Sequence, residues 1–281
     1  MCNFLKVLEN LEQQNLVVAC DEGVYHIAKH IQLIYSDKFK NLFIMLGDFH
    51  LLKAGLACVG KYLRDSGIEH LLIESRIFGS NVVEQVFLGS NYSRSIKGFF
   101  LIAEVLERLL LEQFILDHPE EFEYEMSLIQ ALKSTFEEGD FNACKNLLND
   151  FKNCSENLIN ELHNYIERNK KTSQTYFYYY NVILMIRTLR DFLRADRSGD
   201  FFLHIDSVKK LLPLFLIMDR THYTRWCTIY LNDILGLEKN YPEIYKEFVS
   251  GKFAIKFSDI PFSSSALDQR LEQTVNKSKK S

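Results

Sequence analysis

The sequence has little proline and little glycine, 4 and 12 of its 281 residues respectively. Both residue types interrupt helices, so their scarcity predicts long helices and little disordered linker. The sequence also has no uncharged apolar run of the roughly 18 residues that span a membrane, and no signal-peptide core at its start. We therefore expect a folded intracellular protein, nuclear or cytoplasmic, without a membrane partner.

Motifs of several large enzyme classes are missing too. There is no P-loop, no GxGxxG and no GxSxG, so kinase, dehydrogenase and α/β-hydrolase functions have no support and no small-molecule cofactor is indicated. The six cysteines form no CxxC pair, which excludes a zinc ribbon and a secreted disulfide framework. The formal net charge of -4 provides no basic surface over the whole protein, so contact with nucleic acid would need a local basic patch.

What is present begins with an α/β pattern. Residues 16–20 and 42–46 are apolar runs typical of buried strands, and residues 23–34, which lie between them, have helical spacing. Residues 4–14 also have helical spacing, and His50 begins a further predicted helix. Two buried strands joined by a helix predict a parallel βαβ unit.

The middle of the chain has a different pattern. Residues 67–251 have apolar residues at helical spacing and no clear strand. After them, "GKFAIKFSDI" alternates like an edge strand, and a capped C-terminal helix follows. We therefore predict a mixed α/β protein that is predominantly helical. A partial α/β core occupies residues 1–66, an all-α insertion 67–251, and a strand and helix that return to the core 252–281.

Each predicted strand is followed by an aspartate, Asp21 after the first and Asp48 after the second. Functional side chains gather at the carboxyl ends of strands in open α/β sheets, which favours metal-binding carboxylates at both positions. Aspartate is also a good N-cap, and Gly-Asp is common in turns, so either residue could instead cap the helix that follows it. The sequence leaves both interpretations open.

Asp268 and Glu272 are four residues apart in the predicted C-terminal helix and so lie on one face of it. Such a stripe either binds metal or forms a solvated surface. Lys277 and Lys279 follow it, and they either contact a phosphate backbone or stabilise the C-terminal end of the helix.

Residues 217–226, "IMDRTHYTRW", form the densest polar and aromatic cluster of the helical region. His222, Arg225 and Trp226, the only tryptophan, suit phosphate contact and base stacking, which predicts a nucleic-acid contact. A buried helix junction, with Trp226 in the protein core, explains the same residues.

Four segments carry a resemblance to a known family: "VVACDEGVYHIAKHIQ", "LFIMLGDFHLLKAGLACVGKYLRDSGI", "DRTHYTRWCTIYL" and "LDQRLEQTVNKSKKS". They resemble uncharacterised, multi-copy animal proteins that look like mobile-element products, and the similarity spans nearly the whole chain. The organisation is also similar to the C-terminal part of an RNase H-like transposase of the hAT kind. That class implies a partial RNase H-like core interrupted by the helical insertion, with DNA as a partner.

In the transposase pattern, Asp21 matches the second acidic position, residues 42–46 the last core strand and Glu272 the final acid. The resemblance therefore implies that Asp21 and Glu272 are catalytic metal ligands, supported by Asp48 and Asp268, around Mg²⁺ or Mn²⁺. Two such ions would activate water or a DNA 3′-hydroxyl for attack on a phosphodiester.

One departure from the pattern bears on activity. The RNase H-like fold begins with a three-strand meander whose first strand supplies the first catalytic aspartate, and no strand is predicted before residue 16 here. We therefore expect a truncated, transposon-derived protein that does not cut DNA as this chain alone. The alternative is a non-catalytic helical scaffold that binds other protein chains, with the acidic residues serving as caps and surface.

Overall fold

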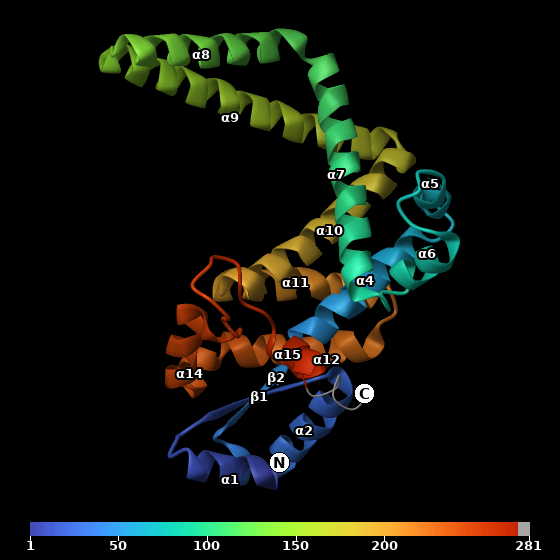
Figure 1. Cartoon of the computed structure of the whole chain (residues 1–281), viewed down its shortest axis with the longest axis vertical. Coiled ribbons are helices and arrows are strands. Elements are labelled where there is room, and N and C mark those ends of the chain that lie inside the picture. The colour runs from blue at the N-terminus through green and yellow to red at the C-terminus, as the bar shows by residue number, and fades with distance from the viewer. Residues whose placement is uncertain (275–281) are drawn as a thin grey trace. The chain divides into compact units, whose positions relative to one another are not determined.

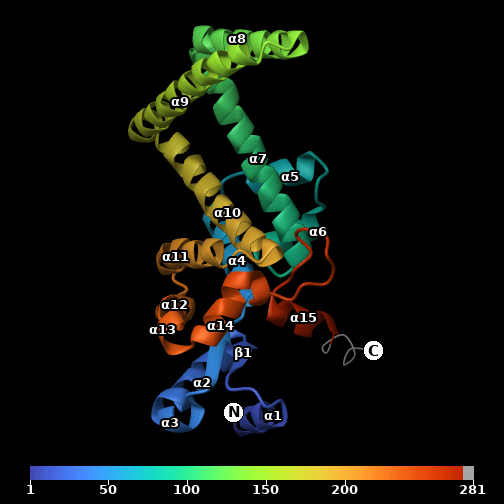
Figure 2. The ribbon, with the colours of Figure 1, turned by 90° about the vertical axis from the view of Figure 1, so that its left-hand side faces the viewer.

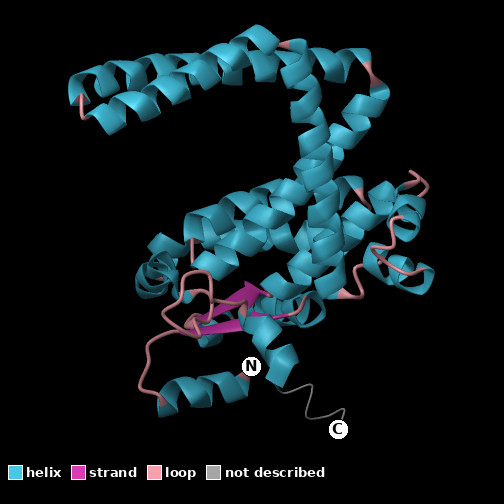
Figure 3. Cartoon of the chain, turned by 45° about the horizontal axis from the view of Figure 1, so that its top comes forward, coloured by secondary structure: helices cyan, strands magenta, loops and turns pink. Residues whose placement is uncertain are grey.

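The computed structural model describes residues 1–274, and helices make up most of them (Figure 3). The chain divides into two compact units. Met1–Phe100 and Met185–Ser281 together form the first, which we call the core unit, and Leu101–Leu184 forms the second unit. The second unit is narrower than the insertion predicted at 67–251, because helices on both sides of it pack with the α/β elements.

The α/β part of the core unit is a small parallel sheet. Strands β1 (Leu16–Cys20) and β2 (Leu42–Leu46) pair with Leu16 opposite Leu42. Helix α2 (Glu22–Ile34) joins them, since parallel strands need a crossover connection. The predicted strand boundaries and βαβ unit are therefore confirmed. Every residue of β2 is buried, which fits its uninterrupted apolar sequence.

Helix α4 (Asp48–Leu63) follows β2 after one residue, Gly47, and is buried along much of its length. The other helices that lie wholly in the core unit are α1 (Cys2–Asn10), α3 (Ser36–Phe39), α5 (Ile68–Glu74), α6 (Ser80–Phe87), α11 (Phe201–Ile217), α12 (Thr221–Leu235), α13 (Leu237–Asn240), α14 (Pro242–Glu247), the π-helical turn η1 (Phe248–Lys252) and α15 (Leu267–Thr274). Helix α4 packs against α6, α11 and α15, and thus connects segments from both ends of the chain.

Two long helices cross from the core unit into the second unit: α7 (Tyr92–Asp117) and α10 (Gln174–Ser198). Within the second unit, α8 (Pro119–Glu138) and α9 (Phe141–Thr172) run side by side (Figures 1 and 2). No helix within residues 1–274, these long ones included, has the combined length and apolar character of a membrane span.

Local sequence explains the turn between α8 and α9. Gly139 has a φ of 79°, a left-handed conformation that ends α8 at little steric cost. The Asp140 side chain then accepts hydrogen bonds from the backbone N–H groups of Asn142 and Ala143 and so caps α9.

The strand predicted at residues 252–260 is wrong. The π-helical turn η1 covers the start of this segment, and a single bridge between Ile255 and Ser265 is the only sheet-like pairing that residues 252–274 make. Phe253 and Ala254 are both buried. Because consecutive side chains of a strand point to opposite faces, two neighbouring core residues do not fit an alternating edge strand.

Candidate functional site

A pocket of about 480 Å³ lies at the carboxyl end of β1. Its polar lining comes from Asp21, His50, Asp268 and Glu272, and we call these four residues the acidic site; most of the other lining residues are apolar. The four residues come from the end of β1, the start of α4 and helix α15, which contacts both β1 and α4 (Figure 2). The fold thus brings together residues from near both ends of the chain.

Asp21 ends β1 and precedes α2. Its Oδ1 accepts a hydrogen bond of 2.9 Å from the Val24 N–H, so the interpretation of Asp21 as an N-cap is confirmed. The same side chain also lines the pocket. The cap occupies one carboxylate oxygen and leaves acceptor capacity on the side chain, so capping does not by itself exclude a ligand role.

Asp268 caps α4 from the other end of the chain. The residue before α4 is Gly47, which has no side chain to accept the first N–H groups of the helix. Asp268 accepts them instead, through Oδ1 from the Phe49 N–H at 3.1 Å and through Oδ2 from the His50 N–H at 3.2 Å. Its Oδ2 also lies 2.9 Å from Nδ1 of the His50 imidazole. These contacts attach α15 to the turn between β2 and α4.

The chain passes very close to this cap at Gly47. A Cβ atom at this position would overlap the Asp268 carboxylate and would lie only 2.9 Å from the carbonyl oxygen of Cys20. The Gly47 N–H donates to that same carbonyl at 2.6 Å. Glycine is therefore required here because two other parts of the chain fill the space of a side chain.

The acidic site has a negative potential. The pKa of His50 is raised above its usual 6.5, first by its hydrogen bond to Asp268 and then by the charge of that carboxylate, while burial opposes the shift. Asp21 and Glu272 add smaller contributions in the same direction. Burial and the charges of Asp21 and Asp268 likewise raise the pKa of the Cys20 thiol, to about 11. The charges of Asp21 and Asp268 thus act on both His50 and Cys20.

Glu272 makes no hydrogen bond or ion pair with any residue in the described part of the chain, and it is exposed at the pocket. It shares the pocket with Asp21 and Asp268, so these three predicted metal ligands lie around one space. Asp48, the fourth predicted ligand, does not line it. Only 2% of Asp48 is exposed, and its Oδ1 lies 3.8 Å from Nε2 of His204 in the interior.

Sequence reasoning missed the interior neighbours of Asp48. Asp196 on α10 and His204 on α11 are both buried, and Oδ1 of Asp196 lies 3.7 Å from Nδ1 of His204. A signal was present, because Phe192 and Leu193 precede Asp196 by four and three residues and so share its face of the helix. A carboxylate on the apolar face of a helix is unusual enough to be a candidate functional residue.

Of the residues predicted to contact nucleic acid, one is buried and two are exposed. Trp226 is 4% exposed and packs edge-on against Tyr25, with ring centroids 6.1 Å apart. Its indole has no free face on which a nucleic-acid base could stack. Trp226 therefore belongs to a buried helix junction, the alternative interpretation of this segment. His222 and Arg225 are exposed on the first turns of α12. Lys277 and Lys279 lie outside the described residues.

The fold and the site define a predominantly helical α/β protein with an acidic pocket at the end of a parallel strand. Over residues 1–281 the chain matches a family described as a domain of unknown function, DUF8702, and it belongs to that family. Comparison with curated proteins gives no match, and comparison with solved structures gives none either.

Proposed function

We propose that this chain derives from RNase H-like transposases or nucleases, and that its acidic site binds a divalent cation that contacts nucleic-acid phosphate. One observation carries the proposal: Asp21 and Glu272, from near opposite ends of the sequence, line one pocket at the carboxyl end of a parallel strand. Open α/β sheets place their functional groups at this end of the strands.

The donor set fits Mg²⁺ or Mn²⁺. Both ions prefer oxygen ligands, and Mg²⁺ is commonly held by one or two carboxylates together with water and phosphate oxygens. Glu272 has a carboxylate without a partner in the described residues, and Asp21 has unused acceptor capacity beyond its cap. The raised pKa of His50 reports the negative potential that a cation would neutralise.

The residues of the acidic site have different roles in this proposal. Asp21 and Glu272 supply ligand oxygens, and Asp268 fixes the start of α4 and so positions His50 at the rim. A bound cation would neutralise phosphate charge and polarise the phosphodiester. The exposed Arg225 on α12 is the proposed phosphate contact outside the pocket.

The second candidate is a non-catalytic scaffold that binds another protein chain. It is favoured by the mostly apolar lining of the pocket, which includes Phe4, Val24 and Ile27 and suits an apolar side chain of a partner. The buried Trp226 also belongs to a structural core. The two candidates differ in whether the pocket needs a metal ion.

Titration with Mn²⁺ tests the first candidate, because electron paramagnetic resonance follows the free ion directly. We expect metal-free protein to bind Mn²⁺, and Asp21→Asn and Glu272→Gln each to weaken binding at least about tenfold by removing one ligand charge. Asp259→Asn is the matched control, since Asp259 is a fully exposed carboxylate away from the pocket. Equal affinity in all four proteins, or no binding in any, would show that the acidic site is not a metal site.

A labelled DNA oligonucleotide tests the phosphate contact in the same samples. Mn²⁺ should increase the affinity of the wild-type protein for DNA, measured by fluorescence anisotropy, and should have no such effect on Glu272→Gln. Arg225→Ala should weaken binding and reduce its salt dependence, since it removes one phosphate contact. DNA binding that ignores Mn²⁺ would contradict the proposal.

A further inference from the structure

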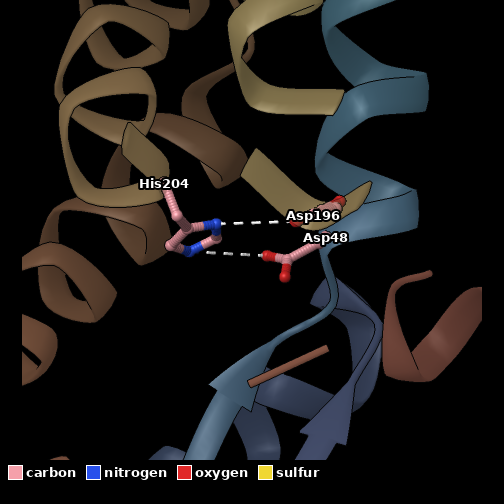
Figure 4. Close-up of side chains that lie close together, drawn as sticks. All are labelled: Asp48, Asp196 and His204. Atoms are coloured by element: carbon pink, nitrogen blue, oxygen red, sulfur yellow. Dashed lines mark ion pairs between the residues drawn. The ribbon is translucent and has the colours of Figure 1, made fainter. Parts of the chain in front are cut away.

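Three polar side chains meet in the interior of the core unit: Asp48 from the first turn of α4, Asp196 from α10 and His204 from α11 (Figure 4). We call them the buried triad. None is more than 3% exposed. One ligand atom from each residue lies within 4.8 Å of the other two. Asp48 precedes Asp196 and His204 by about 150 residues, so the packing of α4 against the later helices brings it to them.

Polar atoms of the buried triad lack partners. Oδ1 of Asp48, Oδ1 of Asp196 and Nδ1 of His204 are buried and make no hydrogen bond to any of residues 1–274. The distances that join His204 to the two carboxylates, 3.8 and 3.7 Å, are longer than hydrogen bonds. Leaving such groups unpaired in an apolar interior is costly, so the native protein needs something that compensates them.

The charges of the buried triad are also unbalanced. Two carboxylates face one imidazole, so even a protonated His204 leaves a net negative charge when both aspartates are ionised. A divalent cation would neutralise both carboxylates at once.

We infer that the buried triad is a closed binding site for one divalent transition-metal ion, which we assign as Zn²⁺. Atoms that ligate zinc at about 2.0–2.2 Å are about 3.4 Å apart at a tetrahedral angle, and further apart at wider angles. Oδ1 of Asp196 lies 3.7 Å from Nδ1 of His204, which is too long for a hydrogen bond but close to the separation of two ligands around one ion. The 3.8 Å distance from Asp48 runs to the other ring nitrogen, Nε2, so the imidazole offers Nδ1 to the ion, and one ligand atom of each triad residue lies within 4.8 Å of the other two. The triad supplies three ligands, and the second oxygen of one carboxylate would supply the fourth.

The donor set favours zinc over the hard cations. Ca²⁺ takes six or more oxygen ligands and Mg²⁺ retains several waters, and neither requirement suits a buried site with an imidazole nitrogen. Zn²⁺ combines histidine and carboxylate ligands in four-coordinate sites. The hydroxyl of Tyr230, which is also fully buried, lies 3.1 Å from Nε2 of His204. It provides the oxygen that orients the imidazole ring, as partners of zinc-binding histidines do.

This site goes beyond the proposed function, because none of the triad residues lines the pocket of the acidic site. Asp268 caps the first turn of α4 at the pocket, whereas the buried Asp48 of the same turn lies beside His204. A zinc ion at the triad would tie α10 and α11 to the turn that carries His50. It is a structural ion, separate from the cation proposed for the pocket.

The first test is the metal content of wild-type protein refolded with Zn²⁺ present, since a closed site fills as the chain folds. After dialysis we expect about one zinc per chain, and a higher melting temperature than in protein refolded with a chelator. X-ray absorption should show a first shell of nitrogen and oxygen at about 2.0–2.2 Å without sulfur. A sulfur shell would place the ion on a cysteine, such as the buried Cys227, and would overturn the assignment.

Substitutions locate the ion. His204→Ala and Asp196→Asn should each lower zinc affinity at least about tenfold, measured by competition with a chromophoric chelator. The matched controls are His222→Ala, at an exposed histidine of α12, and Asp206→Asn, at an exposed aspartate of α11. Both variants should bind zinc with the affinity of the wild type. Asp21→Asn should also retain it, which separates this site from the acidic site. Asp196→Asn preserves side-chain shape and is the variant expected to fold if His204→Ala does not.

Two outcomes would overturn the inference. One is wild-type protein that folds in the presence of Zn²⁺ and contains none. The other is zinc that stays bound with unchanged affinity in folded Asp196→Asn. If neither variant folds, the absorption spectrum of the wild-type protein still decides, because it must show imidazole and oxygen ligands without sulfur.

Discussion

Asp268 caps a helix that begins some 220 residues before it. Other helices of this chain are capped locally: Asp21 accepts from Val24, and Asp200 accepts from Leu203. At α4 the local cap position is glycine, and the carboxylate arrives from α15. The physical role is the same, since in each case a carboxylate satisfies N–H groups at the positive end of a helix. The difference is that the cap of α4 also couples the two ends of the sequence.

Removing this carboxylate should lower stability. We expect Asp268→Ala to reduce the free energy of unfolding by about 1–3 kcal/mol, because two helix N–H groups and the His50 imidazole lose a buried charged acceptor. Urea denaturation measures the change. Asp259→Ala removes an exposed aspartate from the same part of the chain and should change stability by less than about 0.5 kcal/mol. Equal effects in the two variants would mean that Asp268 is not a functional cap.

The same contact predicts a pH dependence. Asp268 raises the pKa of His50 in the folded state above its usual 6.5, so protonated His50 stabilises the fold. That contribution is fully present below pH 6.5 and is lost as the pH rises through the folded-state pKa. NMR titration of His50 should show the raised pKa in the wild type and a lower one in Asp268→Asn. An unchanged pKa in that variant would contradict the cause we assign.

At the scale of elements, helix α4 is the centre of the core unit. Its first turn contacts α15, and further along it packs against α6 so closely that Gly60 has no room for a side chain. A Cβ atom on Gly60 would overlap the backbone carbonyl of Phe87 at the end of α6. Backbone cannot move aside as a flexible side chain can, so this glycine sets the distance between the two helices.

Gly60→Ala therefore separates packing from helix propensity. Propensity alone predicts that alanine stabilises the middle of a helix by up to about 1 kcal/mol. We expect the opposite sign, a loss of about 1–3 kcal/mol, because overpacking forces α4 and α6 apart. Gly23→Ala in α2 is the control, since a Cβ there makes only an ordinary contact of 3.8 Å with the Asp21 carboxylate. The urea midpoints of the two variants measure the change in stability. A Gly60→Ala variant more stable than the wild type would contradict the close approach of α4 to α6.

At the scale of the whole molecule, both proposed sites lie in the core unit. The acidic site and the buried triad both lie within Met1–Phe100 and Met185–Ser281, and no residue of either belongs to the second unit. Within the second unit, α8 and α9 pack mainly on each other. Gln113, near the end of α7, and Ser173, just before α10, line one pocket. The ends of the α8–α9 hairpin are therefore close enough for a short connection.

Excision of the hairpin tests this independence. We expect that a variant in which a short Gly-Ser linker replaces residues 119–172 loses helical signal in circular dichroism. It should still unfold cooperatively and retain the zinc stoichiometry of the wild type, because the core unit has its own buried core. Loss of cooperative unfolding would mean that the hairpin is needed for the core unit to fold.

Local sequence determined much of the secondary structure. The two strands follow from short apolar runs, and the cap at Asp21 and the start of α8 at Pro119 depend on chemistry within a few residues. The βαβ unit also followed, because two buried strands joined by a helix have few other arrangements. The strand predicted at 252–260 was wrong because the prediction rested on the local alternation of apolar and polar residues. Which residues of this segment are buried depends instead on the elements that pack against it.

Tertiary structure alone decided the sites. Spacing along a helix placed Asp268 and Glu272 on one face, but only the fold brought α15 to β1 and α4. Asp48 followed a strand as Asp21 did, yet packing turned it inward to Asp196 and His204. Such partners are separated by well over a hundred residues, and hydrophobic periodicity reports only the face on which a residue lies. Which faces meet depends on the packing of the whole core, so the buried triad became visible only in three dimensions.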